Sequence, residues 1–263
     1  MHISQIRDDL LEEQQALDAI VAKLSDEQWK LSTPSPRWTV ADQIAHLSYF
    51  DTTAVIAISD PEAFTVLVSE LTTLTNSSGL DDYSLKEYRG LNPSDLLSEW
   101  RSRRIALAAA SEGLRDDDRI TWYGPSMGAK SFLTARMMEV WAHGQDVVDT
   151  IGVQRNPTDR LRHIVKLGYI TRNWAYINRG LVPLETPIHV TLKSPSGELW
   201  EFGLENEGNQ IDGSALDFCL VVTQRRSVND TDLRVSGEAA TNWLSIAQAF
   251  AGPPTTGPQI NAE

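Results

Sequence analysis

Residues 136–148 read Arg-Met-Met-Glu-Val-Trp-Ala-His-Gly-Gln-Asp-Val-Val and lie inside a stretch, 132–151, that has the length and apolar content of a helix. Side chains four residues apart on a helix project from the same face, so Glu139 and His143 are placed to grip one ion together. Ser131, which follows several turn residues, predicts an N-cap for this helix. A Glu and a His at this spacing also occur on many solvated helix faces, so the pair alone is a weak indication of a metal.

Three other stretches predict long helices. Between 3 and 24 the apolar residues recur at three- and four-residue spacing, which is typical of an amphipathic helix. Thr39, with a carboxylate three residues on, approximates a capping box for a helix over 40–58. Asn92 and the proline after it open a helix that runs to about residue 112. Together with 132–151, these helices predict a four-helix bundle.

The connection over 60–91 combines apolar pieces with two polar runs, Asn76-Ser-Ser-Gly79 and Asp81-Asp82. It predicts one short helix within a loop-rich segment. Its acidic residues outnumber its basic ones, and its first arginine is Arg89.

The texture changes after residue 180. A helix over 158–178 is expected to bridge to this part. Alternating residues predict a hairpin of strands at 188–192 and 199–203. A helix, a strand and a last helix are expected at 215–223, 233–236 and 238–250. The sequence therefore predicts an α+β protein of two domains, a helical bundle over 1–180 and a small α+β domain over 183–252, with a flexible tail at 253–263.

Composition narrows the class of protein. A net charge of -13 disfavours nucleic acid as a partner, because phosphate binding depends on clustered Lys and Arg. The densest basic cluster, Arg101-Ser-Arg-Arg104, is interpreted as a solvated face or a local anion site. Cys219 is the only cysteine, so no internal disulfide can form. Without an apolar leader or membrane span, we expect a cytoplasmic monomer or homodimer that acts on a small molecule.

A second histidine strengthens the metal hypothesis. His46 lies near the edge of an apolar stripe formed by Val40, Ile44 and Leu47. An isolated histidine in such a place is usually a satisfied core residue. If its helix meets the helix that bears the Glu and His pair, the bundle gains two imidazoles and one carboxylate. Three protein ligands with one open position are typical of catalytic zinc, although nickel and Fe(II) stay open.

Two motifs carry a family resemblance. Trp38-Thr-Val-Ala-Asp-Gln-Ile-Ala-His46-Leu and the stretch 136–148 resemble the two metal motifs of the DinB-like superfamily, in its mycothiol-dependent maleylpyruvate isomerase branch. Residues 232–244, Asp-Leu-Arg-Val-Ser-Gly-Glu-Ala-Ala-Thr-Asn-Trp-Leu, resemble the C-terminal domain attached to many of those proteins. His46, Glu139 and His143 match the family's ligand positions.

The resemblance implies a DinB-like bundle whose metal binds the thiolate of a low-molecular-weight thiol, which is mycothiol in actinobacteria. A thiol that coordinates such an ion is deprotonated, so the site would supply a nucleophile at neutral pH. For isomerisation of maleylpyruvate, the thiolate would add to the alkene, allow rotation and leave again. S-transfer to another small electrophile is the related reaction.

Several residues are candidates for supporting roles. Asp146 would orient His143 as an acceptor, or is simply solvated. Arg136 would bind a substrate carboxylate, or pairs with Glu139. Because guanidinium binds carboxylate bidentately, Arg226 is a further candidate.

Three more residues are expected to contact the thiol or the substrate. Trp122 and Tyr123 precede the helix at 132–151, where the rim of a pocket would lie. Arg234, together with Arg225, would complete a carboxylate clamp between domains. The alternative for both arginines is an ordinary surface position.

Functions of other classes remain open at this point. The same scaffold can host a metal-dependent hydrolase that uses bound water, or a tailoring enzyme of secondary metabolism. A metal-binding module without turnover is a further alternative. The open-sided set of ligands argues against it, because structural zinc usually has four protein ligands.

Overall fold

The computed structural model describes residues 2–71, 82–124, 126–205 and 208–255. The chain forms two compact units, Met1–Gln154 and Arg155–Glu263. The sequence predicts a bundle domain that extends to residue 180, whereas the segment 158–178 belongs to the second unit. The polar run Asn76–Gly79 and Asp81 lie outside the described residues.

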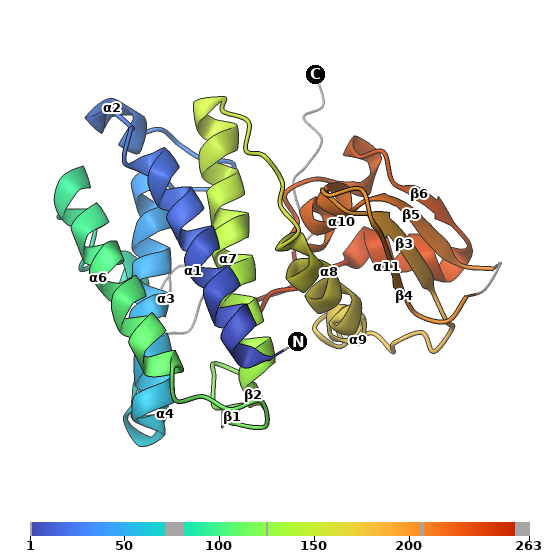
Figure 1. Ribbon diagram of the computed structural model, residues 1–263, viewed down its shortest axis with the longest axis horizontal. Coiled ribbons are helices and arrows are strands. Elements are labelled where there is room, and N and C mark those ends of the chain that lie inside the picture. Colours follow the sequence, from blue (N-terminus) through green and yellow to red (C-terminus); the bar gives the residue numbers. More distant parts are fainter. Residues whose placement is uncertain (1, 72–81, 125, 206–207, 256–263) are drawn as a thin grey trace. The chain divides into compact units, whose positions relative to one another are not determined.

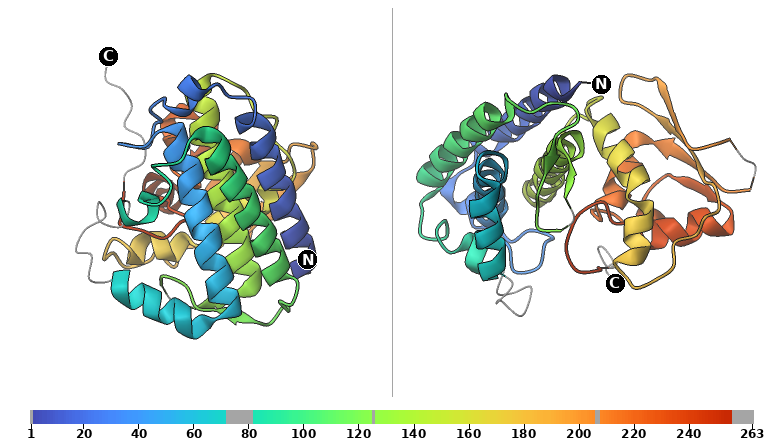
Figure 2. Two further views of the ribbon diagram at one scale, coloured as in Figure 1. Left: turned by 90° about the vertical axis from the view of Figure 1, so that its left-hand side faces the viewer. Right: turned by 90° about the horizontal axis from the view of Figure 1, so that it is seen from below.

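The first unit is built on four long helices that lie side by side (Figures 1 and 2). α3 contacts α4, α6 and α7, and α1 contacts α6 and α7. A short antiparallel pair, β1 and β2, precedes α7. The bounds of the elements are α1 Ile3–Val21, α2 Asp26–Trp29, α3 Val40–Ser59, α4 Pro61–Leu71, α6 Pro93–Ser111, β1 Arg119–Ile120, β2 Met127–Gly128 and α7 Ala129–Ile151.

Capping residues explain where these helices begin. Thr39 forms a complete capping box with Asp42, as predicted, because each side chain accepts from the other residue's backbone N–H. Asn92 accepts from the N–H of Asp95 at the start of α6. The predicted cap at Ser131 is wrong, because α7 already begins at Ala129 and has Gly128 as its N-cap.

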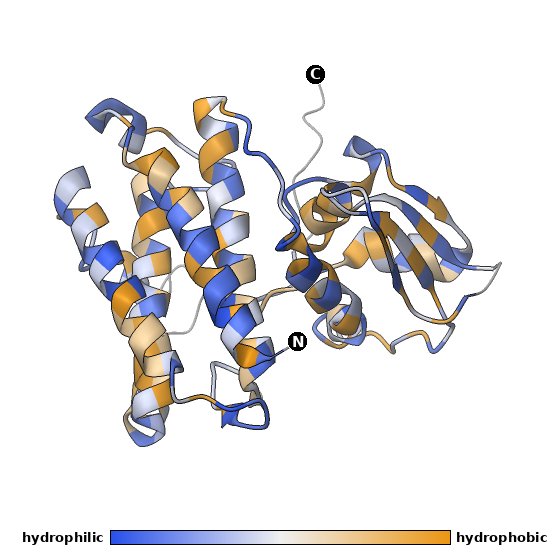
Figure 3. Cartoon of the chain, viewed as in Figure 1, coloured by the Kyte–Doolittle hydropathy of each residue, from blue (hydrophilic) through white to orange (hydrophobic). Residues whose placement is uncertain are grey.

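The bundle buries one apolar cluster between its helices, and Figure 3 shows hydrophobic bands running along helices whose other faces are hydrophilic. Its largest fully buried side chains include Trp100, Phe132 and Leu17. The basic cluster is neither a bare solvated face nor a vacant anion site: Arg101 and Arg104 of α6 both donate to the buried carboxylate of Asp18 on α1.

The second unit combines a four-stranded sheet of order β4-β3-β5-β6 with short helices. β3 pairs antiparallel with β4 and parallel with β5, and β6 closes the sheet antiparallel to β5. α8 packs on α10. The bounds are α8 Leu161–Ile170, α9 Arg172–Ile177, β3 His189–Lys193, β4 Leu199–Phe202, β5 Gln210–Ser214, α10 Ala215–Val222, η1 Val228–Asp230, β6 Arg234–Ser236 and α11 Glu238–Ile246.

The α+β class and the β3–β4 hairpin are confirmed, whereas three details differ. The helix expected over 158–178 is divided at Thr171, and the last helix ends at Ile246 rather than 250. β5 was not predicted, since Asp212 and Gly213 are weak strand formers. None of the helices that the structure describes is long and apolar enough to cross a membrane.

The first residues of the expected flexible tail are held by side chains of the second unit. Asn178 donates to the carbonyl of Gly252 at 3.0 Å, and Gln248 donates to that of Pro253 at 3.3 Å. Arg179 donates to the carbonyl of Thr255. Residues 253 and 255 of the expected tail are therefore held by side chains of the second unit; residues 256–263 lie outside the described part.

Candidate metal centre

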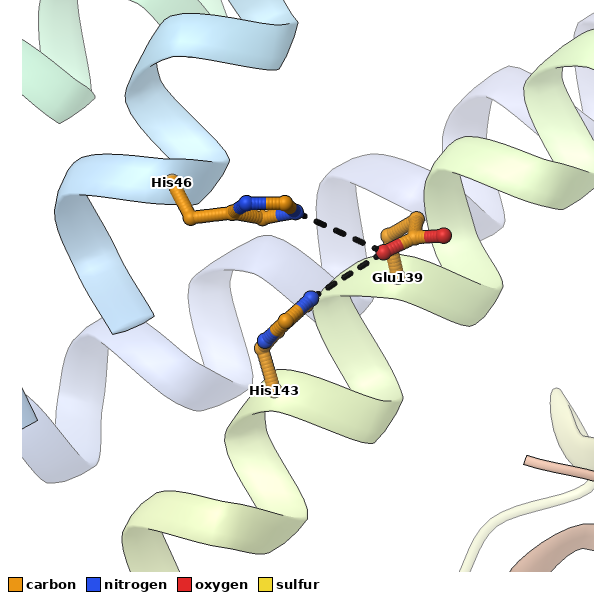
Figure 4. A group of neighbouring side chains, drawn as sticks. All are labelled: His46, Glu139 and His143. Atoms are coloured by element: carbon orange, nitrogen blue, oxygen red, sulfur yellow. Dashed lines mark hydrogen bonds and ion pairs between the residues drawn. The ribbon is translucent and has the colours of Figure 1, made fainter. Parts of the chain in front are cut away.

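Three side chains from two helices converge inside the first unit. His46 projects from α3, and Glu139 and His143 project from successive turns of α7 toward it (Figure 4). Glu139 Oε2 lies 3.1 Å from His143 Nε2 and 3.7 Å from His46 Nε2. The two imidazole centroids are 4.3 Å apart.

The spacing of these atoms fits a shared divalent ion. One ligand atom of each residue lies within 4.8 Å of the others. With bonds of about 2.1 Å, two ligands of a tetrahedral zinc are about 3.4 Å apart, which lies between the two measured N–O distances. The side chains of His46, Glu139 and His143 are 16%, 22% and 10% exposed, so the set is largely buried but in partial contact with solvent.

A buried amide fixes the orientation of one imidazole. His143 Nδ1 is hydrogen-bonded to Oε1 of Gln43, a fully buried residue one turn before His46 on α3. Because an amide oxygen can only accept, this contact is a hydrogen bond when Nδ1 carries the ring proton and donates it. The other nitrogen, Nε2, is then the one available to the site.

The electrostatics of the site favour a cation. Burial and the neighbouring His143 lower the pKa of His46 to about 3, so its imidazole is neutral at ordinary pH. Burial acts to raise the pKa of Glu139, but the rings of His143 and His46 beside its carboxylate outweigh this effect and hold that pKa well below its usual value. The site therefore presents an ionised carboxylate and a neutral imidazole.

Aromatic rings form the wall behind the two histidines. Trp38 stacks on His143, with centroids 5.7 Å apart and an interplanar angle of 15°. It also contacts His46, and the His46 ring contacts Phe50, with centroids 4.5 Å apart. These rings limit the rotation of both imidazoles.

Arg136 lies one turn before Glu139 on α7 but does not have the ion-pair partner we expected. Its Nη2 donates to Oδ1 of Asp51 on α3 at 3.1 Å, and both side chains are buried. Asp51 also accepts from Gln14 of α1 at 3.3 Å. The guanidinium thus joins helices in the interior, and a direct role in binding substrate is not supported by this arrangement.

Asp146 was predicted to orient the ring of His143, but other residues lie at both nitrogens of that ring. Gln43 occupies Nδ1, and Glu139 lies at Nε2. Asp146 is buried and accepts from the hydroxyl of Ser35, in the loop before α3, at 2.9 Å. Asp146 therefore contacts the loop before α3 through Ser35.

The two expected rim aromatics pack into the bundle. Trp122 stacks on Phe64 of α4, with centroids 5.3 Å apart and an interplanar angle of 2°. Tyr123 contacts Phe64 and Phe50, with centroids 5.2 Å and 5.5 Å away. Through Phe50, this aromatic cluster is continuous with the ring of His46.

The remaining candidates belong to the second unit. Arg225 and Arg226 follow α10, where Arg226 donates to the carbonyl of Arg225, and Arg234 begins β6 with an exposed side chain. Cys219 on α10 is fully buried, and burial raises the pKa of its thiol well above the usual value. It therefore stays protonated and cannot serve as the nucleophile.

Sequence reasoning did not single out Gln43, Thr33 or Asp51. A signal for the first was present, since Gln43 lies three residues before His46 and so shares its face of the helix. A polar residue at a fully buried helix position needs a partner. The partner itself, on another helix, could not be read from the spacing.

The chain has relatives of two kinds. It matches the family model described as the mycothiol maleylpyruvate isomerase N-terminal domain over residues 10–148, a range that contains all three candidate ligands. Two proteins described as uncharacterized, from the CDC 1551 and H37Rv strains of Mycobacterium tuberculosis, are each 43% identical to it over 249 residues, or 95% of this chain and 96% of theirs.

Solved structures share the fold. Crystal structures of the mycothiol-dependent maleylpyruvate isomerase and of a histidine-to-alanine variant of it each match with a TM-score of 0.58. Each match covers 90% of this chain and 95% of the other at 16% identity. At this level of identity, the likeness concerns the fold.

Proposed function

Since the chain belongs to the family of the mycothiol maleylpyruvate isomerase N-terminal domain, we propose that it is an enzyme that holds one divalent metal and activates a low-molecular-weight thiol, such as mycothiol. The ligands are His46, Glu139 and His143. Zinc suits this donor set best, and nickel and Fe(II) are alternatives. The convergence of these three side chains from α3 and α7 is the observation that carries the proposal.

The hydrogen bond to Gln43 supports a cation in the site. Because His143 Nδ1 already donates its proton, a neutral ring has a lone pair at Nε2, facing the carboxylate of Glu139 at 3.1 Å. Two lone pairs at that distance repel each other. Either a second proton on the ring or a metal ion relieves the repulsion, and the presence of a second imidazole beside the same carboxylate favours the metal.

The bound metal would supply a Lewis acid that makes a coordinated thiol ionise at neutral pH. The residues of the chain do the rest. Glu139 offsets part of the positive charge, the two imidazoles bind as neutral ligands, and Trp38 with Phe50 excludes water from one side. The partial exposure of the ligands leaves access for the thiol.

The proposed reaction is isomerisation of, or S-transfer to, a small electrophile. In isomerisation, a C–S bond forms at an activated cis alkene, the former double bond rotates, and the same C–S bond breaks. The thiol is then regenerated, so it is not consumed. In S-transfer, the thiolate displaces a leaving group, which departs with the electron pair of its bond to carbon; the new C–S bond persists, and one thiol is consumed for each product.

Metal content is the first test. We expect about one zinc per full-length chain by plasma mass spectrometry, and loss of the zinc in His46→Ala, Glu139→Ala and His143→Ala. His189→Ala, which removes a histidine of the second unit, is the matched control and should keep its zinc. Wild-type protein that takes up no zinc, nickel or Fe(II) on reconstitution would refute the proposed metal site.

The second test separates the two reactions. The metal-loaded protein is incubated with mycothiol and either maleylpyruvate or an electrophile that has a leaving group, and the product and free thiol are quantified. Isomer formation with constant thiol supports isomerisation, and stoichiometric thiol loss supports transfer. Metal-loaded protein that shows neither reaction, and no perturbation of a Co(II) spectrum by mycothiol, would contradict thiol activation.

A further inference from the structure

Gln43 is fully buried, and its amide makes two hydrogen bonds. Its oxygen contacts the ring of His143, and its NH2 group contacts the hydroxyl of Thr33. Resting on the metal site proposed above, we infer that Thr33 sets the direction of this amide and thereby keeps the lone pair of His143 on Nε2, the nitrogen that faces the site. Thr33 and Gln43 are positioning residues in this scheme, since neither touches the metal or the substrate.

The hydroxyl proton of Thr33 bears on which end of the Gln43 amide faces His143. The hydroxyl of Thr33 lies 3.0 Å from the carbonyl of Trp38 and 3.5 Å from that of Ser35, and carbonyls only accept. The Thr33 hydroxyl donates to the carbonyl of Trp38, and its oxygen accepts from Gln43 Nε2, 2.8 Å away. In this arrangement the amide presents its NH2 group to Thr33 and its oxygen to His143.

The state of His143 follows in turn. An oxygen at Nδ1 keeps the ring proton there and leaves the lone pair on Nε2, which faces Glu139. With the amide reversed, an NH2 group would face Nδ1, which would then have to accept. A neutral ring would carry its proton on Nε2 and could not bind a metal through that atom.

The loop before α3 holds Thr33 in place. The N–H of Thr33 donates to the carbonyl of Trp38 at 2.8 Å, and the N–H of Val40 donates to that of Leu31 at 3.0 Å. The hydroxyl of Ser35, in the same loop, donates to Asp146 of α7. Asp146 therefore acts on His143 at a distance, by anchoring the loop that orients the amide.

The test is a double-mutant comparison in the full-length protein. Thr33→Val removes the hydroxyl while keeping the branched shape, and it is made with Gln43 and with Gln43→Glu. A carboxylate has two accepting oxygens, so it cannot present the wrong end to His143. We expect Thr33→Val to weaken zinc binding about 10-fold with Gln43, measured by chelator competition, and to have no effect with Gln43→Glu. Thr33→Ser, which keeps the hydroxyl, is the control.

A second readout needs no metal. Nitrogen-15 NMR of the His143 ring in metal-free protein should show a protonated Nδ1 in the wild type and in Thr33→Ser, and an unprotonated Nδ1 in Thr33→Val. Circular dichroism confirms that each variant is folded. Equal loss of zinc affinity in both Gln43 backgrounds, or an unchanged ring proton in Thr33→Val, would overturn the inference. Wild-type protein without metal affinity would refute the proposed function instead, and the NMR result would still decide the role of Thr33.

Discussion

Replacing Arg136 with methionine should expose the cost of an unpaired charge inside the bundle. The Arg136 and Asp51 side chains are 4% and 0% exposed, and their N–O distance is 3.1 Å. Methionine occupies a similar volume but leaves the Asp51 carboxylate with the amide of Gln14 as a neutral donor. Breaking a buried pair in this way costs about 3–5 kcal/mol, because the remaining charge stays desolvated.

The pH dependence of that cost has a definite sign. Burial raises the pKa of Asp51 in the folded protein, and Arg136 opposes the rise. A carboxyl whose pKa is raised on folding stabilises the protein at low pH, and this stabilisation is lost as pH rises from the unfolded-state value of about 3.9 through the folded-state value. Arg136→Met raises the folded-state pKa further. The loss in unfolding free energy should therefore grow from acid to alkaline pH.

Urea unfolding followed by far-UV circular dichroism, at about pH 5 and about pH 8, measures this difference. Adding Asp51→Asn to Arg136→Met removes the unpaired charge and should restore most of the lost stability at the higher pH. Arg115→Met, at an exposed arginine that pairs with Asp118, is the control and should change little. An equal loss at both pH values, or no recovery in the double variant, would refute the explanation.

Three further changes test the fold. Asp18→Asn should lower the free energy of unfolding by about 1–2 kcal/mol at neutral pH. Hydrogen bonds from arginines of α6 lower the pKa of Asp18, so the stability it contributes is present above its ordinary pKa and is lost as the pH falls through the folded-state value. Urea unfolding across this pH range measures the loss. Gly168→Ala should lower the melting temperature, because the added Cβ would lie 2.7 Å from Val222, whereas Gly113→Ala, with open space around it, should not. Thr39→Ala should cost about 1 kcal/mol in urea unfolding through loss of the α3 capping box.

The sequence predicted the features of the fold that depend on residues close together in the chain. Thr39 and Asn92 cap helices where their side chains were expected to, because a cap depends on residues within one turn. β5 was not predicted, because its formation depends on parallel pairing with β3, which precedes it by about twenty residues. The family resemblance drawn from the two motifs is confirmed by the match over residues 10–148.

The candidate site shows the same division more sharply. Spacing along α7 placed Glu139 and His143 on one face, since four residues make about one turn. It also placed Arg136 beside Glu139, but the partner of that arginine came from α3, where Asp51 offers a buried carboxylate. Helical spacing predicts which side chains share a face, whereas the partners across the interface depend on how two helices meet. Gln43 is the clearest case. The sequence predicted its position on a helix, but the hydrogen bonds of its side chain depend on His143 from another helix and Thr33 from a loop.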